Sequence, residues 1–516
     1  MAACESPLPT PPCVAVCGAD PDPTVWWFRA LVVAHLLVWP LAATLTRPNP
    51  SLDMGETLFW GHEWRMGYTK HPPLPSWIAE TVAVATGRAL WAQYLLAHAA
   101  VVLAFWAVWR LAREMVSPRL ALLAVALLEC CPFYSVRCHE LNNNVGLYPC
   151  WALAVLFLYW ALRTGRTRCW LAAGICLGLG MLTKYTTGIL AATLLGFGLA
   201  DSEARRWWRH PGPYLAIAAA VLLFLPHVWC AASQGFATLR YAAAQVVGGP
   251  GWIGRVLNPL EFLAEQLGIL AAVPAVLLVA TGGKPRLRQA AESPRWPRTF
   301  LACVALAPLA CHVAVAVLAN RALRPVYGSP LWLWAGLLAV VVLEIPSDPA
   351  RWRRIWIAWG VAVTALGAGF TAATVAAPYL LHKPARCLFP GRELAARVAE
   401  VWKSRYSGPL PIVAGDYFLA GSVAFFHPDR PRVYESGNEP INDTAIRDCP
   451  WLSDDEFRRR GGVILWDLDA DPAGLRRDVL RRFRVREIVK LPPLDYLTRA
   501  KLPPVRIGVA IVPPGP

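Results

Sequence analysis

The sequence predicts a polytopic α-helical membrane protein followed by a small α/β domain outside the membrane. Hydrophobic residues make up 56% of its 516 residues and charged residues only 16%, below the ~25% that is usual for soluble domains. Charged residues form about 12% of residues 1–379 but about 28% of residues 380–516. Apolar runs near the ~20 residues that a bilayer requires recur through the first part. This composition excludes a single soluble domain, a disordered chain and a nucleic-acid-binding tail.

Eleven apolar runs make up the predicted membrane region. Each one approaches the length of a helix that crosses the hydrocarbon core. The two runs beside Lys184 are short, and they could instead form one broken hairpin. Trp26 and Trp27 lie at the start of the first run, as interfacial aromatic residues do. The runs cover 26–46, 89–109, 119–136, 145–162, 169–183, 185–200, 213–232, 262–281, 300–319, 328–345 and 355–378.

Basic residues are shared unequally between alternate loops, which predicts the orientation. Seventeen of them lie in one set of loops and ten in the opposite set, and the richer set is expected in the cytoplasm. Residues 1–24 then form a cytoplasmic tail, 25–379 the membrane domain and 380–516 an extracytoplasmic domain. The tail lacks the basic start of a signal peptide, so we expect the first run to be a retained span.

The first predicted outer loop, residues 47–88, carries a dense group of reactive side chains. Asp53 and Glu56 lie three residues apart, on one face if the segment is helical. Lys70 and His71 precede a rigid Pro-Pro pair. Carboxylates beside such cations could deprotonate an acceptor while holding a phosphate-bearing leaving group. The competing interpretation is a solvated loop whose acidic residues cap a helix.

The later outer loops add polar and basic side chains at the same membrane face. The loop after Arg137 is rich in Asn, which suits hydrogen bonding to a sugar or phosphate but also turn formation. Lys184 lies between apolar runs and could bind phosphate or simply anchor at the interface. Arginines on the same side suit an anionic partner or act as interfacial anchors. These residues are Glu140, Asn142, Asn144, Lys184, Tyr185, Arg240, Arg321 and Arg324.

No metal site is predicted, because the spacing of Cys4, Cys13 and Cys17 completes no zinc pattern. Cys387 and Cys449 are the two cysteines of the predicted outer domain, where a disulfide is permitted. In that domain, 391–402 has helical spacing. Short apolar runs predict strands over 410–413, 462–466 and 507–512.

Several motifs together resemble one family of membrane enzymes. They cover about residues 25–345, and the first-loop motif is the most specific. The motifs are Asp53-x-x-Glu56, Trp64-x-x-Gly67-Tyr68-x-Lys70-His71-Pro72-Pro73, Asn142 and Asn144 before Pro149-x-Trp151, and Gly178-x-Gly180-x-Leu182-x-Lys184-Tyr185. The chain resembles the bacterial branch of the dolichyl-phosphate-mannose protein mannosyltransferase superfamily, which is similar to glycosyltransferase family 39 and has the GT-C fold.

The resemblance implies a glycosyltransferase in the bacterial inner membrane that uses a polyprenyl-phosphate sugar, usually on undecaprenyl phosphate. The acceptor would be lipid A, another envelope glycan or a protein, with membrane lipids as further partners and no nucleic acid. No cofactor is certain, and a divalent cation is left open. A transporter of a lipid-linked or anionic substrate is the alternative. The sequence shows no apparent internal repeat and its polar residues cluster at one membrane face, and both observations favour the enzyme.

The resemblance also assigns roles to residues. Asp53 would be the general base and Glu56 would position it or the acceptor. Aminoarabinose transferases to lipid A read Glu-Lys-Pro-Pro where this chain reads Lys70-His71-Pro72-Pro73, so the sugar is not assigned. The donor phosphate would contact Lys70, His71, Lys184, Arg321 and Arg324, and the substrates would contact Tyr68, Glu140, Asn142, Asn144, Tyr185 and Arg240.

Overall fold

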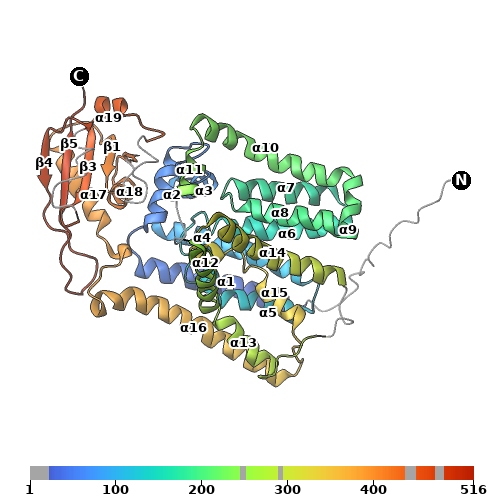
Figure 1. Ribbon diagram of the computed structural model, residues 1–516. Coiled ribbons are helices and arrows are strands. Elements are labelled where there is room, and N and C mark those ends of the chain that lie inside the picture. The colour runs from blue at the N-terminus through green and yellow to red at the C-terminus, as the bar shows by residue number, and fades with distance from the viewer. Residues whose placement is uncertain (1–21, 245–250, 289–294, 436–448, 471–481, 516) are drawn as a thin grey trace.

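The computed structural model describes residues 22–244, 251–288, 295–435, 449–470 and 482–515. A body of helices makes up most of it, and a small sheet domain lies beyond one end of the helices (Figure 1). The predicted cytoplasmic tail lies outside the described residues except for its last three positions. The same holds for Cys4, Cys13 and Cys17.

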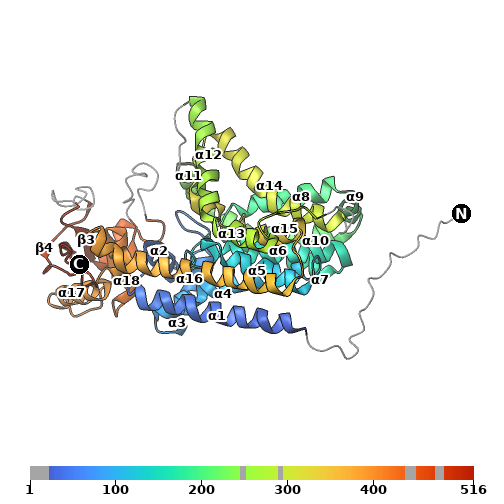
Figure 2. The ribbon, with the colours of Figure 1, turned by 90° about the horizontal axis from the view of Figure 1, so that it is seen from below.

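Six helices in the described residues are long and apolar enough to cross a membrane. A bent pair, α12 (Gly251–Ile269) and α13 (Ala272–Thr281), turns by 57° and would make a seventh span. In Figure 2, α12 and α14 project away from the rest of the helical body. The six are α1 (Pro23–Thr46), α4 (Leu90–Ala112), α6 (Leu147–Thr164), α10 (Pro211–Ser233), α14 (Arg295–Ala319) and α16 (Pro349–Leu380).

All eleven predicted runs fall on helices, but a count of eleven full spans is not confirmed. Four of the helices have only 8 to 15 residues. One of these, α5, is buried at every position from Leu120 to Glu129. It packs against α4 and α15 in the core. The four short helices are α5 (Pro118–Glu129), α7 (Thr167–Met181), α8 (Thr187–Ala200) and α15 (Ala335–Val342).

Close backbone approach holds α7 against α10. A Cβ atom built on Gly174 would lie 2.1 Å from the carbonyl oxygen of Ala216, so only glycine fits there. Small residues at helix interfaces are a common means of packing membrane helices. The outer faces of α10 and α16 expose large apolar side chains such as Leu222 and Val361, as expected for surfaces in contact with lipid.

The segments between the long helices form shorter helices. Two of them, α2 (Leu52–His62) and α3 (Leu74–Ala85), make up the predicted first outer loop and pack against each other. The Ser51 hydroxyl caps α2 by accepting a hydrogen bond from the Met54 backbone N–H at 3.2 Å. The remaining segments are η1 (Pro132–Tyr134), α9 (Ser202–Arg205), η2 (Arg206–Arg209), α11 (Ala237–Ala244), η4 (Pro325–Gly328) and η5 (Arg386–Leu388).

The C-terminal domain is a five-stranded mixed sheet with helices, in the strand order β2-β1-β3-β5-β4. Strand β1 (Ile412–Gly415) runs parallel to β2 (Arg432–Tyr434) and β3 (Gly462–Asp467). Strand β5 (Ile507–Val512) pairs antiparallel with β3 and with β4 (Glu487–Lys490). The helices are α17 (Gly391–Lys403), α18 (Tyr417–Phe426) and α19 (Asp454–Arg460).

The predicted strands near β1, β3 and β5 and the predicted helix near α17 are therefore present. Strands β2 and β4 were not expected from the sequence. Cys387 and Cys449 are both free and buried, so the disulfide that the sequence permits is not formed.

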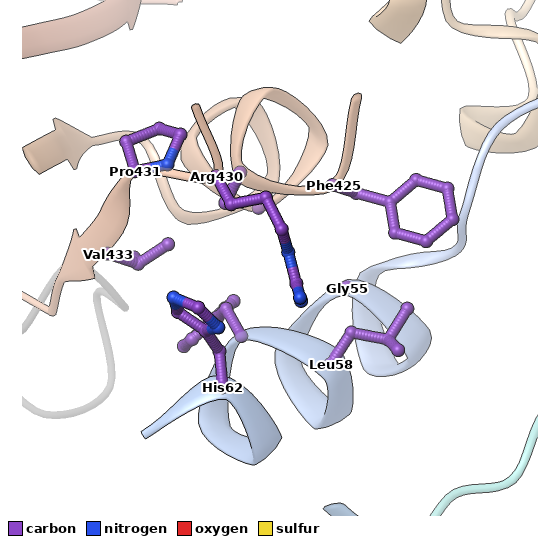
Figure 3. Close-up of a pocket in the computed structure, with 10 residues that line it drawn as sticks. Gly55, Leu58, His62, Phe425, Arg430, Pro431 and Val433 are labelled. Atoms are coloured by element: carbon purple, nitrogen blue, oxygen red, sulfur yellow. The ribbon is translucent and has the colours of Figure 1, made fainter. Parts of the chain in front are cut away.

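Three arginines connect the C-terminal domain to the first loop. Arg432 pairs with Glu63 at 2.5 Å, and Arg430 pairs with the buried Glu80 at 2.9 Å. Arg88 donates in the opposite direction, to the carbonyl oxygens of Phe425 and His427 at 2.9 and 2.8 Å. A pocket of only about 20 Å³ remains between α2 and α18, and Figure 3 shows Arg430 reaching across it toward α2. The two parts are therefore closely docked.

An Arg432→Ala variant should loosen this docking. The substitution leaves the Glu63 carboxylate, which is 5% exposed, without its partner, at a cost of about 2–5 kcal/mol. We expect a lower melting temperature and faster hydrogen exchange in α2 and α18. The control is Arg397→Ala, whose exposed pair with Glu393 on α17 contributes at most about 0.5 kcal/mol. Equal effects of the two variants would contradict this account.

Candidate active site

The two carboxylates on α2 occupy different environments. Asp53 is exposed in the first turn of the helix, whereas Glu56, one turn later, is buried. Glu56 contacts the Lys70 ammonium at 3.1 Å. The Tyr417 hydroxyl, from the start of α18, donates a hydrogen bond to the same carboxylate at 2.6 Å. Burial raises the pKa of Glu56 above its usual value, and the Lys70 charge opposes this.

Asp53 lines a cavity of about 490 Å³. Glu140 lies in the same cavity and accepts a hydrogen bond from the Ser51 hydroxyl. Burial and the negative charge of Asp53 raise the pKa of Glu140 to about 8. Near pH 7 the carboxyl group of Glu140 is therefore mostly protonated. The cavity is lined by Arg47, Ser51, Leu52, Asp53, Glu140, Phe370, Ala373, Thr374, Ala385, Arg386 and Cys387.

Lys184, between α7 and α8, is the centre of a second cluster of basic side chains. Its ammonium donates to the Asn144 side-chain oxygen at 2.6 Å and lies 4.8 Å from the centre of the Tyr327 ring. Burial lowers the pKa of Lys184 to about 8, with the Asp53 charge raising it and the Arg324 charge lowering it. Lys184, Asp53 and Arg324 therefore interact in one electrostatic cluster.

His71 lies near both lysines but is not itself a cation. Burial, followed by the charges of Lys184 and Lys70, lowers the pKa of His71 to about 3. The imidazole is therefore neutral at physiological pH and can contribute a hydrogen bond to a phosphate but no charge. Its ring packs edge-on against Trp60 and Tyr241.

Backbone contacts hold the Lys70 segment in place. The Nδ1 of His227 donates to the Met66 carbonyl at 2.5 Å, and the Thr238 hydroxyl donates to the Tyr68 carbonyl at 2.9 Å. The Leu74 N–H donates to the Leu182 carbonyl at 3.0 Å, which joins this segment to the turn that carries Lys184. The Asn143 side chain donates to the Thr183 carbonyl at 2.7 Å and adds the Asn-rich loop. Three of the predicted outer loops thus form one unit.

Some predicted substrate-binding residues have structural contacts in this structure. Tyr68 is buried and stacks on Trp60. The Tyr185 hydroxyl lies 2.7 Å from the Nε2 of His227. The Asn142 side chain accepts from the N–H groups of the next turn, and Arg240 donates to the Gly235 carbonyl. Arg321 follows α14 on the same connection as Arg324.

Sequence reasoning missed two site residues, both from the C-terminal domain. Tyr417 contacts Glu56, and Glu435, directly after β2, accepts a hydrogen bond from the Thr69 hydroxyl at 3.0 Å. A Gly-Asp turn before Tyr417 was a weak signal: Asp416 caps α18 by accepting from two backbone N–H groups. No local pattern marks Glu435. In the described residues, no group of three or more His, Cys, Asp or Glu side chains could hold a metal ion.

Comparisons with known proteins agree with this architecture. Residues 70–230 match a family model described as dolichyl-phosphate-mannose-protein mannosyltransferase. The lipopolysaccharide core galacturonosyltransferases RgtA and RgtB of Rhizobium johnstonii are each 25% identical, over 78% and 85% of this chain and 81% and 87% of theirs. The structure of ArnT from Cupriavidus metallidurans bound to undecaprenyl phosphate superposes with a TM-score of 0.63 at 15% identity, covering 95% of this chain and 99% of that one.

The fold and these relatives define a multi-pass membrane glycosyltransferase with the GT-C fold. The similarity to glycosyltransferase family 39 and the protein mannosyltransferase superfamily, inferred above from the loop motifs, is confirmed.

Proposed function

We propose that this enzyme transfers a sugar from a polyprenyl-phosphate donor to an acceptor hydroxyl at the outer face of the bacterial inner membrane. The observation that carries the proposal is the position of Asp53. Its carboxylate lines the cavity of about 490 Å³. It also interacts electrostatically with Lys184, the centre of the second cluster of basic side chains. A base is thereby adjacent both to a space for an acceptor and to cations suited to a phosphate.

In the proposed reaction, Asp53 takes the proton of the acceptor hydroxyl. The hydroxyl oxygen then attacks the anomeric carbon from the side opposite the phosphate, so the configuration inverts. The bond between the anomeric carbon and the phosphate oxygen breaks, and the polyprenyl phosphate leaves with the electron pair. Lys70, Lys184 and Arg324 stabilise the charge that develops on this oxygen, and His71 donates a hydrogen bond.

The related proteins indicate which partners this proposed reaction would have. One solved structure of the same fold is bound to undecaprenyl phosphate, which supports this lipid as the carrier. Two relatives act on the lipopolysaccharide core, which supports an acceptor in lipopolysaccharide. In the proposed topology the N-terminal tail is cytoplasmic, and residues 380–516 lie outside with the first loop.

The direct test is transfer by the purified full chain in lipid nanodiscs. We expect sugar transfer from at least one member of a panel of undecaprenyl-phosphate sugars to lipopolysaccharide core or lipid A, with release of undecaprenyl phosphate and an inverted anomeric configuration in the product. Nucleotide sugars serve as the control donors and should not react. Transfer from a nucleotide sugar, or a product with retained configuration, would contradict the proposal.

A further inference from the structure

The C-terminal domain supplies two side chains to the Lys70 site. The Tyr417 ring lies 4.7 Å from the Lys70 ammonium while its hydroxyl donates to Glu56. Glu435 accepts from the Thr69 hydroxyl with both carboxylate oxygens, at 3.1 and 3.0 Å. Glu56, Lys70 and Glu435 are only 9%, 8% and 4% exposed. Glu56 contacts the Lys70 ammonium directly, and Glu435 interacts with the same ammonium electrostatically, so two carboxylates depend on one cation in an enclosed space.

The charge balance of this cluster is unfavourable for two ionised carboxylates. Burial raises the pKa of Glu435 to about 7, with the Lys70 charge lowering it and the Glu56 charge raising it. Among the described residues, the other titratable neighbours add little positive charge, because His71 is neutral and buried Cys449 is a thiol. The charge of Asp53 acts on Glu56 as well. In the part of the chain that the structure describes, the phenols of Tyr417 and Tyr241 are further ionisable groups at the cluster, and the centre of the Tyr241 ring lies 5.7 Å from the Lys70 ammonium.

A donor phosphate would bring another negative charge to Lys70. If Lys70 turned to the phosphate while Glu56 and Glu435 both stayed ionised, two buried carboxylates would lose most of their compensation. Such uncompensated buried charge is strongly unfavourable, and a buried carboxyl group avoids it by binding a proton. Replacing the ion pair between Lys70 and Glu56 by one between Lys70 and the phosphate therefore costs the least free energy when a carboxylate binds a proton at the same time.

We propose that Tyr417 and Glu435 are positioning residues for the donor, and that Lys70 turns to the donor phosphate as the pair Glu56 and Glu435 takes up one proton from solvent. One O–H bond forms on a carboxylate, one ion pair is exchanged for another, and no other bond changes. The C-terminal domain then takes part in the donor site rather than only covering it. This inference rests on the proposed function, because it assumes that the donor phosphate binds near Lys70.

Isothermal titration calorimetry tests the proton directly. The probe is methyl undecaprenyl phosphate, a phosphodiester without a transferable sugar, chosen because a monoester phosphate titrates near pH 6 itself. Titrations of the full chain at pH 7.5 in two buffers with different ionisation enthalpies give the number of protons bound. We expect net uptake by the wild type. Its affinity for the probe should fall about fourfold from pH 6 to 7.5, as expected for a group that titrates near pH 7.

Glu435→Gln should abolish most of this proton uptake and flatten the pH dependence to less than about twofold, while the amide oxygen that it introduces still accepts from the Thr69 hydroxyl. The matched control, Glu393→Gln on the exposed face of α17, should behave like the wild type. Tyr417→Phe keeps the ring beside Lys70 and should raise KM for the donor with a smaller change in kcat. Binding without proton uptake in the wild type, or unchanged uptake in Glu435→Gln, would overturn the inference. Absence of probe binding by the wild type would instead count against the proposed function.

Discussion

Asp53→Asn is expected to lower kcat for sugar transfer by about 10²–10⁴-fold, the usual contribution of a positioned general base. The amide has nearly the same shape but cannot accept the proton of the acceptor hydroxyl. Donor binding should be largely retained, because the substitution leaves in place the contacts that hold Lys70 and Lys184 in the free enzyme, with Glu56 and Asn144. The measurement is a single-turnover assay beside equilibrium binding of undecaprenyl phosphate.

Glu140→Gln is the informative comparison for Asp53→Asn. Since burial and the Asp53 charge raise the pKa of Glu140 to about 8, its carboxyl group is already mostly neutral near pH 7, and glutamine imitates that form. The Ser51 hydroxyl can still donate to it. We expect a loss of less than about tenfold, the size of one altered hydrogen bond. Equal losses in the two variants would show that Asp53 has no special role, and a larger loss in Glu140→Gln would move the role of base to Glu140.

The sequence predicted the part of the site that is local in the chain. Asp53 and Glu56 are one helical turn apart, and Lys70 and His71 follow in the same loop, so spacing alone suggested their association. Lys184, in the third loop, is held near this group because the Leu74 N–H donates to the Leu182 carbonyl, a contact that spacing in the sequence does not reveal. The neutral state of His71 follows from burial between two lysines, which a sequence pattern does not express.

Two kinds of feature were not predictable from local patterns. Tyr417 and Glu435 contact residues 361 and 366 positions earlier, and such separations leave no periodic signal. Hydropathy also fails to separate a buried helix from a span: α5 has only 12 residues and is enclosed by protein, the length range in which a buried core helix is the better assignment. Its last residue, Glu129, is paired with His35 at 3.1 Å and accepts from Trp39.

Lys70→Met and Lys184→Met should both lower kcat/KM for the donor by about 10²–10³-fold, the typical cost of removing one group that stabilises developing charge. Their effects on stability should differ. Removing Lys70 leaves the buried Glu56 without its ion-pair partner, at a cost of about 3–5 kcal/mol. Lys184 has a neutral partner in Asn144, so its loss leaves no uncompensated charge of that kind. We therefore expect a marked fall in melting temperature for Lys70→Met alone.

A double variant separates the two functions of Lys70. Combining Lys70→Met with Glu56→Gln removes the orphaned carboxylate, so the melting temperature should recover most of the way to that of the wild type, while kcat/KM for the donor should stay low. Such partial rescue would show that Lys70 stabilises the fold through Glu56 and binds the donor independently of that pairing. Recovery of activity together with stability would mean that Lys70 has only a structural role, and the donor phosphate would then be assigned to Lys184 and Arg324.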